Sequence, residues 1–266
     1  MKDISVVLPQ STTNIEIIML GDIHRGSRQF DEKLFLETIN YIKNTPNCYT
    51  IINGDAIDNA IKGSKSNCHL ATESPQESVN WLIDTLRPLA ELNKILAIGP
   101  GNHEERTERE TGNDPMWWVA RCLGIEDRYF DGIFILYVSL GKNRNRIGKY
   151  HTFTIVGGHG TGGGGTPQSM AKKLQDLSQI VVNADVYVMG HLHQQVWVPK
   201  ARYVVDPRTK RHYYLDPLLV GGQAFLEFEG SYGERKMFSP SSKRIPIIML
   251  QTGYDTKRAE LRTVNF

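Results

Sequence analysis

"YVMGHLH", residues 187–193, places two histidines one residue apart behind an apolar run and a glycine. Burying an imidazole is costly unless its ring nitrogens find hydrogen-bonding or metal partners. Core packing gives no reason for His191 and His193 to stand here together. The stretch therefore predicts that partners for both rings come from other parts of the chain.

Four further segments repeat this pattern of an apolar run followed by glycine and polar side chains. The runs are short and rich in β-branched residues, as in buried strands, and they cover residues 15–20, 49–53, 94–99 and 153–157. The polar groups that follow are GDIH (21–24), GDAID (54–58), GNHEE (101–105) and GGHG (157–160). Ligands of open α/β sheets gather beyond the carboxyl ends of strands. The five segments, which hold five of the eight histidines, are therefore expected to meet at one edge.

Predicted helices lie between several of these strands, at residues 31–44, 74–92, 114–124 and 166–181. Three of them begin with a capping residue followed by proline, a common helix start. Strand–helix alternation predicts an α/β fold. From about residue 195 the sequence is β-rich, with a hairpin around Asp206 and strands at 245–252 and 257–266. The whole chain, 1–266, is expected to form one domain, a sandwich of mixed sheets covered by helices.

The overall composition indicates an ordinary globular protein, with 40% hydrophobic and 23% charged residues among 266. The net charge of +2 is too small to indicate a nucleic-acid binder or a membrane-surface protein. Three widely spaced cysteines argue against a disulfide framework and a structural zinc site, and they suit a reducing compartment. No apolar run approaches the ~18 residues of a membrane span, and the N-terminal segment does not resemble a signal peptide. We therefore expect a soluble, cytoplasmic protein that does not bind membranes.

The five segments supply carboxylates, imidazoles and one amide as donors, and they supply no thiolate. Each motif alone is common as a plain turn, but five of them at strand ends favour metal binding. Nitrogen and oxygen donors of this mix suit manganese, iron or zinc, and magnesium is less favoured by imidazole. Seven donors exceed one tetrahedral site and suit two metals bridged by a carboxylate: Asp22, His24, Asp55, Asn102, His159, His191 and His193.

The order of the motifs, GD-x-H, GD-x-x-D, GNH-E, GH and GH-x-H over residues 21–193, resembles the calcineurin-like metallophosphoesterases. The resemblance implies an α/β fold in four layers, with two facing mixed β-sheets flanked by helices, and a dinuclear metal centre. It implies a bridging role for Asp55 between two ligand sets: Asp22, His24 and His193 for one metal, and Asn102, His159 and His191 for the other.

The resemblance also implies hydrolysis of a phosphoester by in-line attack of a metal-bound hydroxide on phosphorus. His103 would lie over the scissile phosphate, where it would stabilise the charged oxygens or protonate the leaving group. Asp58 would hold the His103 ring in the needed tautomer. The expected cofactors are two divalent metal ions, with manganese favoured over iron, zinc, nickel and magnesium.

Five residues beside the motifs are candidates for substrate contact: Arg25, Asn59, Arg106, Gly162 and Gly163. The two arginines could equally be solvated surface residues. The glycine-rich stretch 160–165 could equally be a slack connection rather than a backbone cradle for phosphate. Asn59 stands where serine/threonine protein phosphatases of this family usually carry a phosphate-binding arginine, which counts against phosphoprotein phosphatase activity.

For the substrate we favour a phosphodiester, and a nuclease acting on DNA or RNA is one form of this activity. A monoester carries about two charges near neutrality and a diester one, so a site without that arginine suits a diester. Residues 141–150 and 207–212 are locally basic and could contact a polyanion. Two alternatives stay open: a phosphomonoesterase acting on a small metabolite or nucleotide, and a non-catalytic protein-binding scaffold. A scaffold has no need of His103, which argues against the second.

Overall fold

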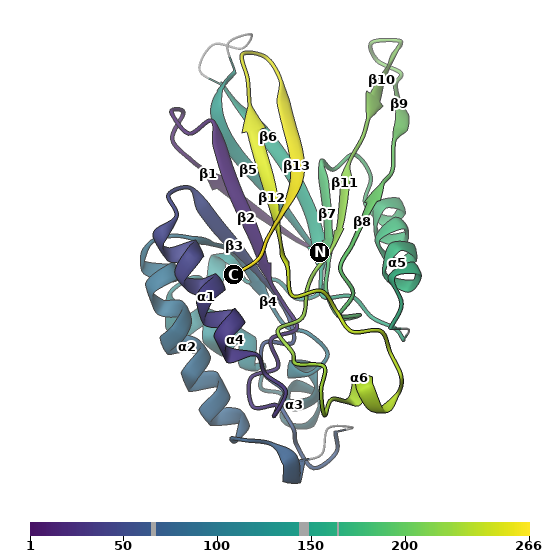
Figure 1. Ribbon diagram of the computed structural model, residues 1–266. Coiled ribbons are helices and arrows are strands. Elements are labelled where there is room, and N and C mark those ends of the chain that lie inside the picture. The colour runs from purple at the N-terminus through teal and green to yellow at the C-terminus, as the bar shows by residue number, and fades with distance from the viewer. Residues whose placement is uncertain (65–67, 144–148, 164) are drawn as a thin grey trace.

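Two β-sheets packed face to face form the centre of the computed structural model, which describes residues 1–64, 68–143, 149–163 and 165–266 (Figure 1). The five-stranded sheet has the order β13-β12-β2-β3-β4, with β2 Asn14–Leu20, β3 Cys48–Asn53, β4 Ile95–Gly99, β12 Ile245–Thr252 and β13 Lys257–Val264. The six-stranded sheet has the order β1-β5-β6-β7-β11-β8, with β1 Lys2–Val7, β5 Phe134–Asn143, β6 Lys149–Gly158, β7 Val186–Met189, β8 Val196–Pro199 and β11 Leu218–Gly221. Strands β2, β3 and β4 are parallel, and so are β6, β7 and β11.

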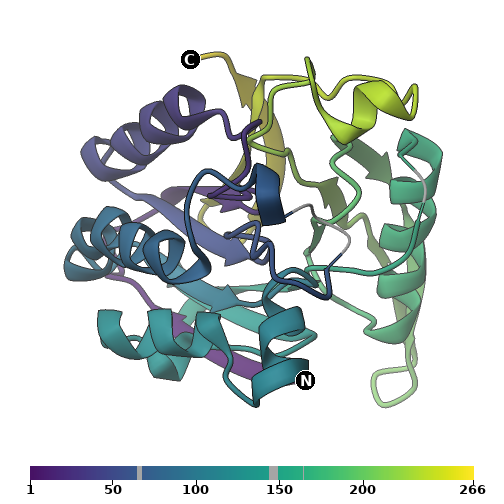
Figure 2. The same ribbon diagram turned by 90° about the horizontal axis from the view of Figure 1, so that it is seen from below.

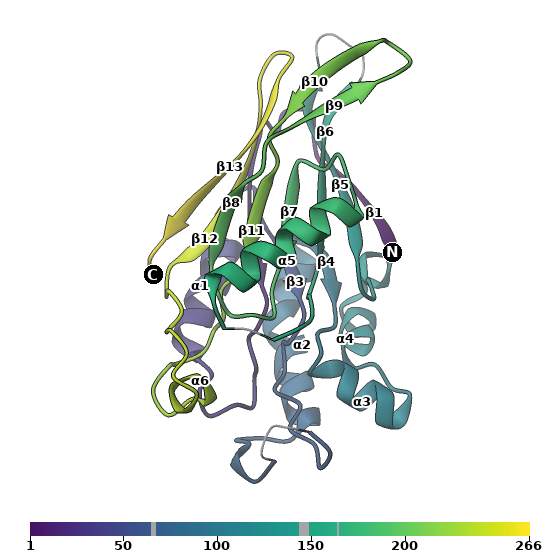
Figure 3. The ribbon, with the colours of Figure 1, turned by 90° about the vertical axis from the view of Figure 1, so that its right-hand side faces the viewer.

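Helices cover the outer face of each sheet and complete four layers (Figures 1 and 3). The five-stranded sheet is covered by α1 Glu32–Asn44, α2 Pro75–Glu91 and α4 Pro115–Leu123, and the six-stranded sheet by α5 Pro167–Ile180. Two more helices, α3 Glu104–Thr111 and the short α6 Tyr232–Arg235, lie at one end of the sandwich. Single 3-10 turns occur at Cys68–Leu70 and Glu126–Arg128. Among the described residues, no helix is both long and apolar enough to cross a membrane.

Strand β2 shows why the apolar runs are continuous rather than alternating. Successive side chains of a strand point to opposite faces. Ile17 and Met19 therefore pack in the core between the sheets, whereas Ile18 and Leu20 pack against α1 and α2. A strand buried on both faces reads as an unbroken apolar run. The predicted four-layer α/β fold is confirmed.

The predicted helices are confirmed to within a residue or two, and their caps form as expected. Ser74 and Glu77 make a reciprocal capping box at the start of α2, and Thr166 caps α5. The predicted hairpin is β9 Arg202–Asp206 paired with β10 Arg211–Leu215.

Strands β1 and β5 and helix α3 were not predicted. Helix α3 has the sequence EERTERET and buries only Glu104, so it lacks the apolar stripe on which helix prediction depends.

Candidate metal centre

The loops that follow β2, β3, β4, β6 and β7 converge at the carboxyl ends of the parallel strands, at the end where α3 lies (Figures 1 and 2). Two of these loops approach so closely that only glycine fits. A Cβ atom on Gly54 would lie 2.6 Å from the backbone nitrogen of Gly101, and one on Gly101 would collide with the Asp55 carboxylate. The glycines therefore allow the side chains of different loops to meet.

The first group of donors comprises Asp22, His24 and His193, whose ligand atoms lie within 4.8 Å of one another. The Nε2 atoms of His24 and His193 are 3.1 Å apart, and Nε2 of His193 lies 3.2 Å from Oδ1 of Asp22. The two ring nitrogens and the carboxylate oxygen therefore face one common point. The sequence segments GDIH and GHLH thus meet across 169 residues of chain.

The second group comprises Asp55, His159 and His191, with Asn102 beside them. Nε2 of His159 lies 3.2 Å from Oδ2 of Asp55 and 3.3 Å from Oδ1 of Asn102. His191 contributes a buried Nδ1 atom that has no hydrogen-bond partner within the described residues. All seven donors predicted from the sequence therefore lie in one of two adjoining groups.

Backbone carbonyls fix the tautomers of the two histidines in the second group. Nδ1–H of His159 donates to the carbonyl of Asn53 at 2.8 Å, which leaves Nε2 facing Asp55. Nε2–H of His191 donates to the carbonyl of Gly162 at 2.8 Å, which leaves the lone pair on its unpartnered Nδ1. Metal-binding histidines typically donate their other N–H in this way. The orphaned nitrogen and the mixed oxygen and nitrogen donors fit divalent metal ions.

The carboxylate of Asp55 lies between the groups. Its Oδ2 is 3.2 Å from Nε2 of His159 and 3.8 Å from the Nε2 atoms of both His24 and His103. Its Oδ1 accepts the backbone N–H of His103 at 2.9 Å. Asp55 is 2% exposed, and the surrounding rings hold the pKa of its carboxyl well below the usual value despite burial. This position supports the predicted bridging role.

Five of the seven donors occupy the left-handed backbone region, with φ between 49° and 71°: Asp22, His24, Asp55, His191 and His193. Residues other than glycine adopt this conformation uncommonly, and such strain persists only where surrounding structure enforces it. Its concentration at the ends of β2, β3 and β7 marks this edge as a functional site.

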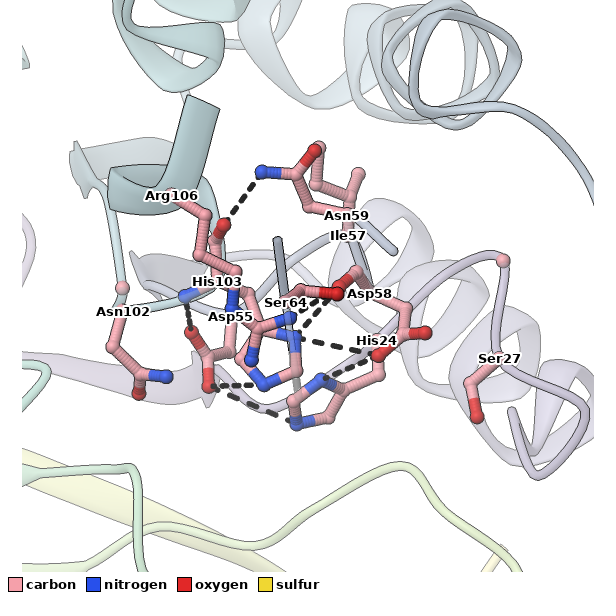
Figure 4. Close-up of polar contacts among 12 residues, drawn as sticks. His24, Ser27, Asp55, Ile57, Asp58, Asn59, Ser64, Asn102, His103 and Arg106 are labelled. Carbon is pink, nitrogen blue, oxygen red and sulfur yellow. Dashed lines mark hydrogen bonds and ion pairs between the residues drawn. The ribbon is translucent and has the colours of Figure 1, made fainter. Parts of the chain in front are cut away.

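His103 lies between Asp55 and Asp58, beside His24 (Figure 4). Its Nδ1–H donates to the backbone carbonyl of Asp58 at 2.7 Å and lies 3.3 Å from the Asp58 carboxylate. Its Nε2 therefore points toward Asp55 and the metal groups. Burial alone would lower the pKa of His103, but Asp58 and Asp55 together raise it. By contrast, burial and the neighbouring His103 lower the pKa of His24 well below its usual value.

The carboxylates around His159 favour the protonated form of its ring. Burial alone would lower its pKa, but the carboxylates of Asp55 and Asp22 raise the pKa of His159 to about 10. A metal must displace this proton to bind at Nε2, so metal affinity is expected to increase as pH rises.

Two buried residues that sequence reasoning missed support the donors. Glu104 accepts the backbone N–H groups of Gly101 at 2.8 Å and of Asp55 and Ile57 at 3.0 Å, so it ties two loops together. Asn53 holds His159 through its carbonyl and donates from its side chain to Gly158 at 3.1 Å. Glu104 was visible in the GNHEE segment, but its three contacts depend on tertiary structure.

The predicted substrate-contacting residues have different surroundings. The Arg25 guanidinium binds Glu73 at 2.7 Å and Glu32 at 2.9 Å and stacks 4.3 Å over Trp81, so these contacts, rather than the histidine groups, hold it. The Arg25 side chain is 18% exposed, so it is not a solvated surface arginine, and its contact with substrate stays a prediction.

Asn59 is buried and also has internal partners. Its side-chain nitrogen donates to the His103 carbonyl at 2.6 Å, and its oxygen accepts from Thr107 at 2.9 Å. Asn59 thus holds the backbone of His103 in place, and its contact with substrate stays a prediction.

Arg106 and the glycine-rich stretch do reach the site. Arg106 donates to the Asp58 carbonyl at 3.3 Å, beside His103 (Figure 4). Gly162 contacts His191 through its carbonyl, and the space around Gly163 is open. One residue of this stretch, Gly164, lies outside the described residues.

The described parts of the two basic segments lie at the opposite end of the molecule from the donors (Figures 1 and 3). Residues 207–212 form the tip of the β9–β10 hairpin (Figures 1 and 3). Residues 141–143 end β5 and residues 149 and 150 begin β6, whose ten residues span roughly 30 Å before the site begins. Residues 144–148 of this segment lie outside the described residues. Position along the chain suggested proximity to the donors, but the strands carry the described parts of both segments away from them.

Comparisons with known proteins give one family match. The family model described as calcineurin-like phosphoesterase matches residues 15–195. A comparison with curated proteins found no match. Similar solved structures include vacuolar protein sorting 29 from Cryptosporidium parvum, at 12% identity, a TM-score of 0.38, and coverage of 96% of this chain and 100% of that chain.

Two other solved structures are similar at the same level. A double mutant of Vps29 from Entamoeba histolytica has 12% identity, a TM-score of 0.41, and coverage of 94% of this chain and 100% of that chain. GAP50 of Plasmodium has 10% identity, a TM-score of 0.41, and coverage of 96% and 85%. The family assignment rests on the sequence match and not on these structures.

Proposed function

The chain belongs to the calcineurin-like phosphoesterase family, and we propose that it hydrolyses a phosphodiester with the help of two divalent metal ions, manganese being favoured. One observation carries the proposal. The Oδ2 atom of Asp55 lies within 3.8 Å of ring nitrogens of His24, His103 and His159, so both donor groups and a proton-bearing histidine meet at one carboxylate. Asp22, His24 and His193 would hold one ion, and Asn102, His159 and His191 the other.

A metal pair, when bound, would supply charge stabilisation for a phosphoryl group and a lowered pKa for water. His103 acts on the leaving group. The Asp58 carbonyl fixes Nδ1–H, so a proton on Nε2 points into the site. Asp58 and Asp55 raise the pKa of His103 despite burial, which favours the protonated ring, and a proton on Nε2 can be donated to the departing alkoxide oxygen.

The surroundings of Asn59 support a diester rather than a monoester. Its amide nitrogen donates to His103 and its oxygen accepts from Thr107, so Asn59 offers no cation to a second phosphate charge. Arg106 is the cation beside His103, and it remains the proposed phosphate contact. Since the described parts of the basic segments lie far from the site, the proposed substrate is a phosphodiester that is not restricted to DNA or RNA.

The test compares bis-p-nitrophenyl phosphate with p-nitrophenyl phosphate after reconstitution with Mn²⁺. We expect metal-dependent hydrolysis with a higher kcat/KM for the diester, and loss of activity on chelation. A clear preference for the monoester would identify a phosphomonoesterase instead. Absence of hydrolysis of both esters by metal-loaded protein would favour the non-catalytic scaffold.

A further inference from the structure

Residues 223–244, here called the α6 segment, leave the site and return to it. Near its start, Phe225 donates its backbone N–H to the Asp22 carbonyl at 3.0 Å. Near its end, Ser239 accepts from the side chain of Gln194 at 3.3 Å, and Ser241 donates to the carbonyl of His193. The segment is therefore anchored on both loops that carry the first group of donors.

The middle of the α6 segment also packs against the glycine-rich stretch. The ring of Phe238 lies against Gly165, where an added Cβ would come within 2.9 Å of the ring. This stretch begins directly after His159 and contacts His191 through Gly162. In Figure 3, α6 and α3 lie on opposite sides of the site end. The α6 segment thus faces the metal donors from the side opposite the helix that follows His103.

Apolar side chains at the tip of the α6 segment are exposed although the sandwich has a large core. Met237 is 92% exposed and has a φ of 56°, and Phe238 is 42% exposed. Backbone bonds hold both in place, because Met237 N–H donates to Glu234 at 3.0 Å and Phe238 N–H to Gly233 at 2.8 Å. Exposed apolar groups held by a strained turn beside a site indicate a binding surface.

A phosphodiester carries a second ester substituent that is not released, and this group needs room beside the metal centre. Since His103 serves the leaving group, the retained substituent has the opposite side of the centre available, where the α6 segment lies. We propose that Met237 and Phe238 form a subsite for this retained substituent, and that the subsite takes a planar or apolar group such as an aryl ring or a nucleobase. The inference rests on the proposed diester hydrolysis.

Two substrates isolate the subsite because they share a leaving group and differ only in the retained substituent. These are bis-p-nitrophenyl phosphate, with an aryl group, and methyl p-nitrophenyl phosphate. Replacing both Met237→Ser and Phe238→Ser should lower kcat/KM for the aryl diester by about 10-fold, mainly through KM, because apolar contacts discriminate over this range. The methyl diester should change less than about twofold. The p-nitrophenyl ester of thymidine 5′-phosphate tests whether a nucleobase takes the aryl position.

A second variant and a matched control guard against trivial effects. Gly165→Ala should displace Phe238 without removing an apolar group. It should therefore also lower the ratio of kcat/KM for the aryl diester to kcat/KM for the methyl diester. The double variant Tyr203→Ser with Val205→Ser removes two side chains that are 71% and 72% exposed on the distant hairpin, and it should leave the ratio unchanged.

The outcomes separate the two claims. Hydrolysis of both diesters with a ratio that neither the Met237/Phe238 variant nor Gly165→Ala changes would overturn the subsite alone. If metal-loaded wild-type protein hydrolyses neither diester, the proposed function is wrong and the subsite falls with it. A ratio that falls in both α6-segment variants and not in the hairpin control would establish the subsite.

Discussion

The two ends of the sandwich differ in which side chains they bury and which they expose. At the carboxyl ends of β2, β3 and β7, polar side chains are buried and held in strained backbone conformations, as Asp22 and Asp55 show with 0% and 2% exposure. At the other end, the β9–β10 hairpin exposes Tyr203 and Val205 to solvent. Burial of polar groups is costly, and single exposed apolar side chains far from a site are ordinary, so the first end carries the stronger indication of function.

The largest effect is expected at Asp55, where both donor groups meet. Asp55→Ala should lower metal affinity and hydrolysis together. Both should fall by more than the roughly 10²-fold typical of a change outside the ligand shell. Metal content by mass spectrometry and kcat/KM on the diester measure both. Asp131→Ala, at an exposed carboxylate, is the matched control and should have neither effect. Full metal content in Asp55→Ala would remove its bridging role.

His103→Ala should separate chemistry from metal binding. We expect turnover to fall by roughly 10²–10⁴ with metal content nearly intact, as for a positioned acid–base group. His212→Ala, an exposed histidine of the hairpin, should change neither quantity. If the His103 variant loses both ions, His103 is a ligand and the assignment is wrong.

Glu104→Gln should lower the stability of the end of the sandwich that carries the donors, because Glu104 ties two of its loops together. The carboxylate accepts three backbone N–H groups, and a carboxamide replaces one acceptor oxygen with a donor. A buried donor left without a partner costs about 1–3 kcal/mol of unfolding free energy. Chemical denaturation should show this loss, whereas Glu105→Gln, at the next position on α3, should not. Equal stability of the two variants would show that Glu104 does not tie the loops.

The smallest effect is expected at the basic tip of the hairpin. Arg208→Ser combined with Lys210→Ser should leave kcat/KM on the nitrophenyl diester within about twofold, because screened charges more than a Debye length from the site contribute little. Incubation of wild type and variant with single- and double-stranded DNA and RNA in Mn²⁺ extends the test to polymers. Polynucleotide cleavage that the variant loses would restore the role first expected for this segment.

The sequence predicted the fold where strands are buried on both faces, since Ile17 and Ile18 serve different cores yet both read as apolar. It also predicted which side chains meet, because five such motifs recur at strand ends, although each motif alone is common as a plain turn. It did not predict α3, which has no apolar face, nor the contacts of Glu104. These depend on which loops meet in space.

The substrate contacts could be predicted least. Arg25 and Asn59 adjoin the motifs in sequence, but an ion pair with Glu73 and hydrogen bonds around His103 occupy their side chains. Neighbours along the chain alternate in direction, so adjacency does not show which side chain faces a ligand. The α6 segment reaches the site from more than 30 residues after His193, and no local motif marks it.

Metal stoichiometry tests the central claim most directly. Protein freed of metal by chelation, reconstituted with Mn²⁺ and passed through a desalting column should carry two ions per chain by mass spectrometry, and diester hydrolysis should rise with their return. One ion per chain at saturation, or full activity without bound metal, would contradict a dinuclear centre built from the seven donors.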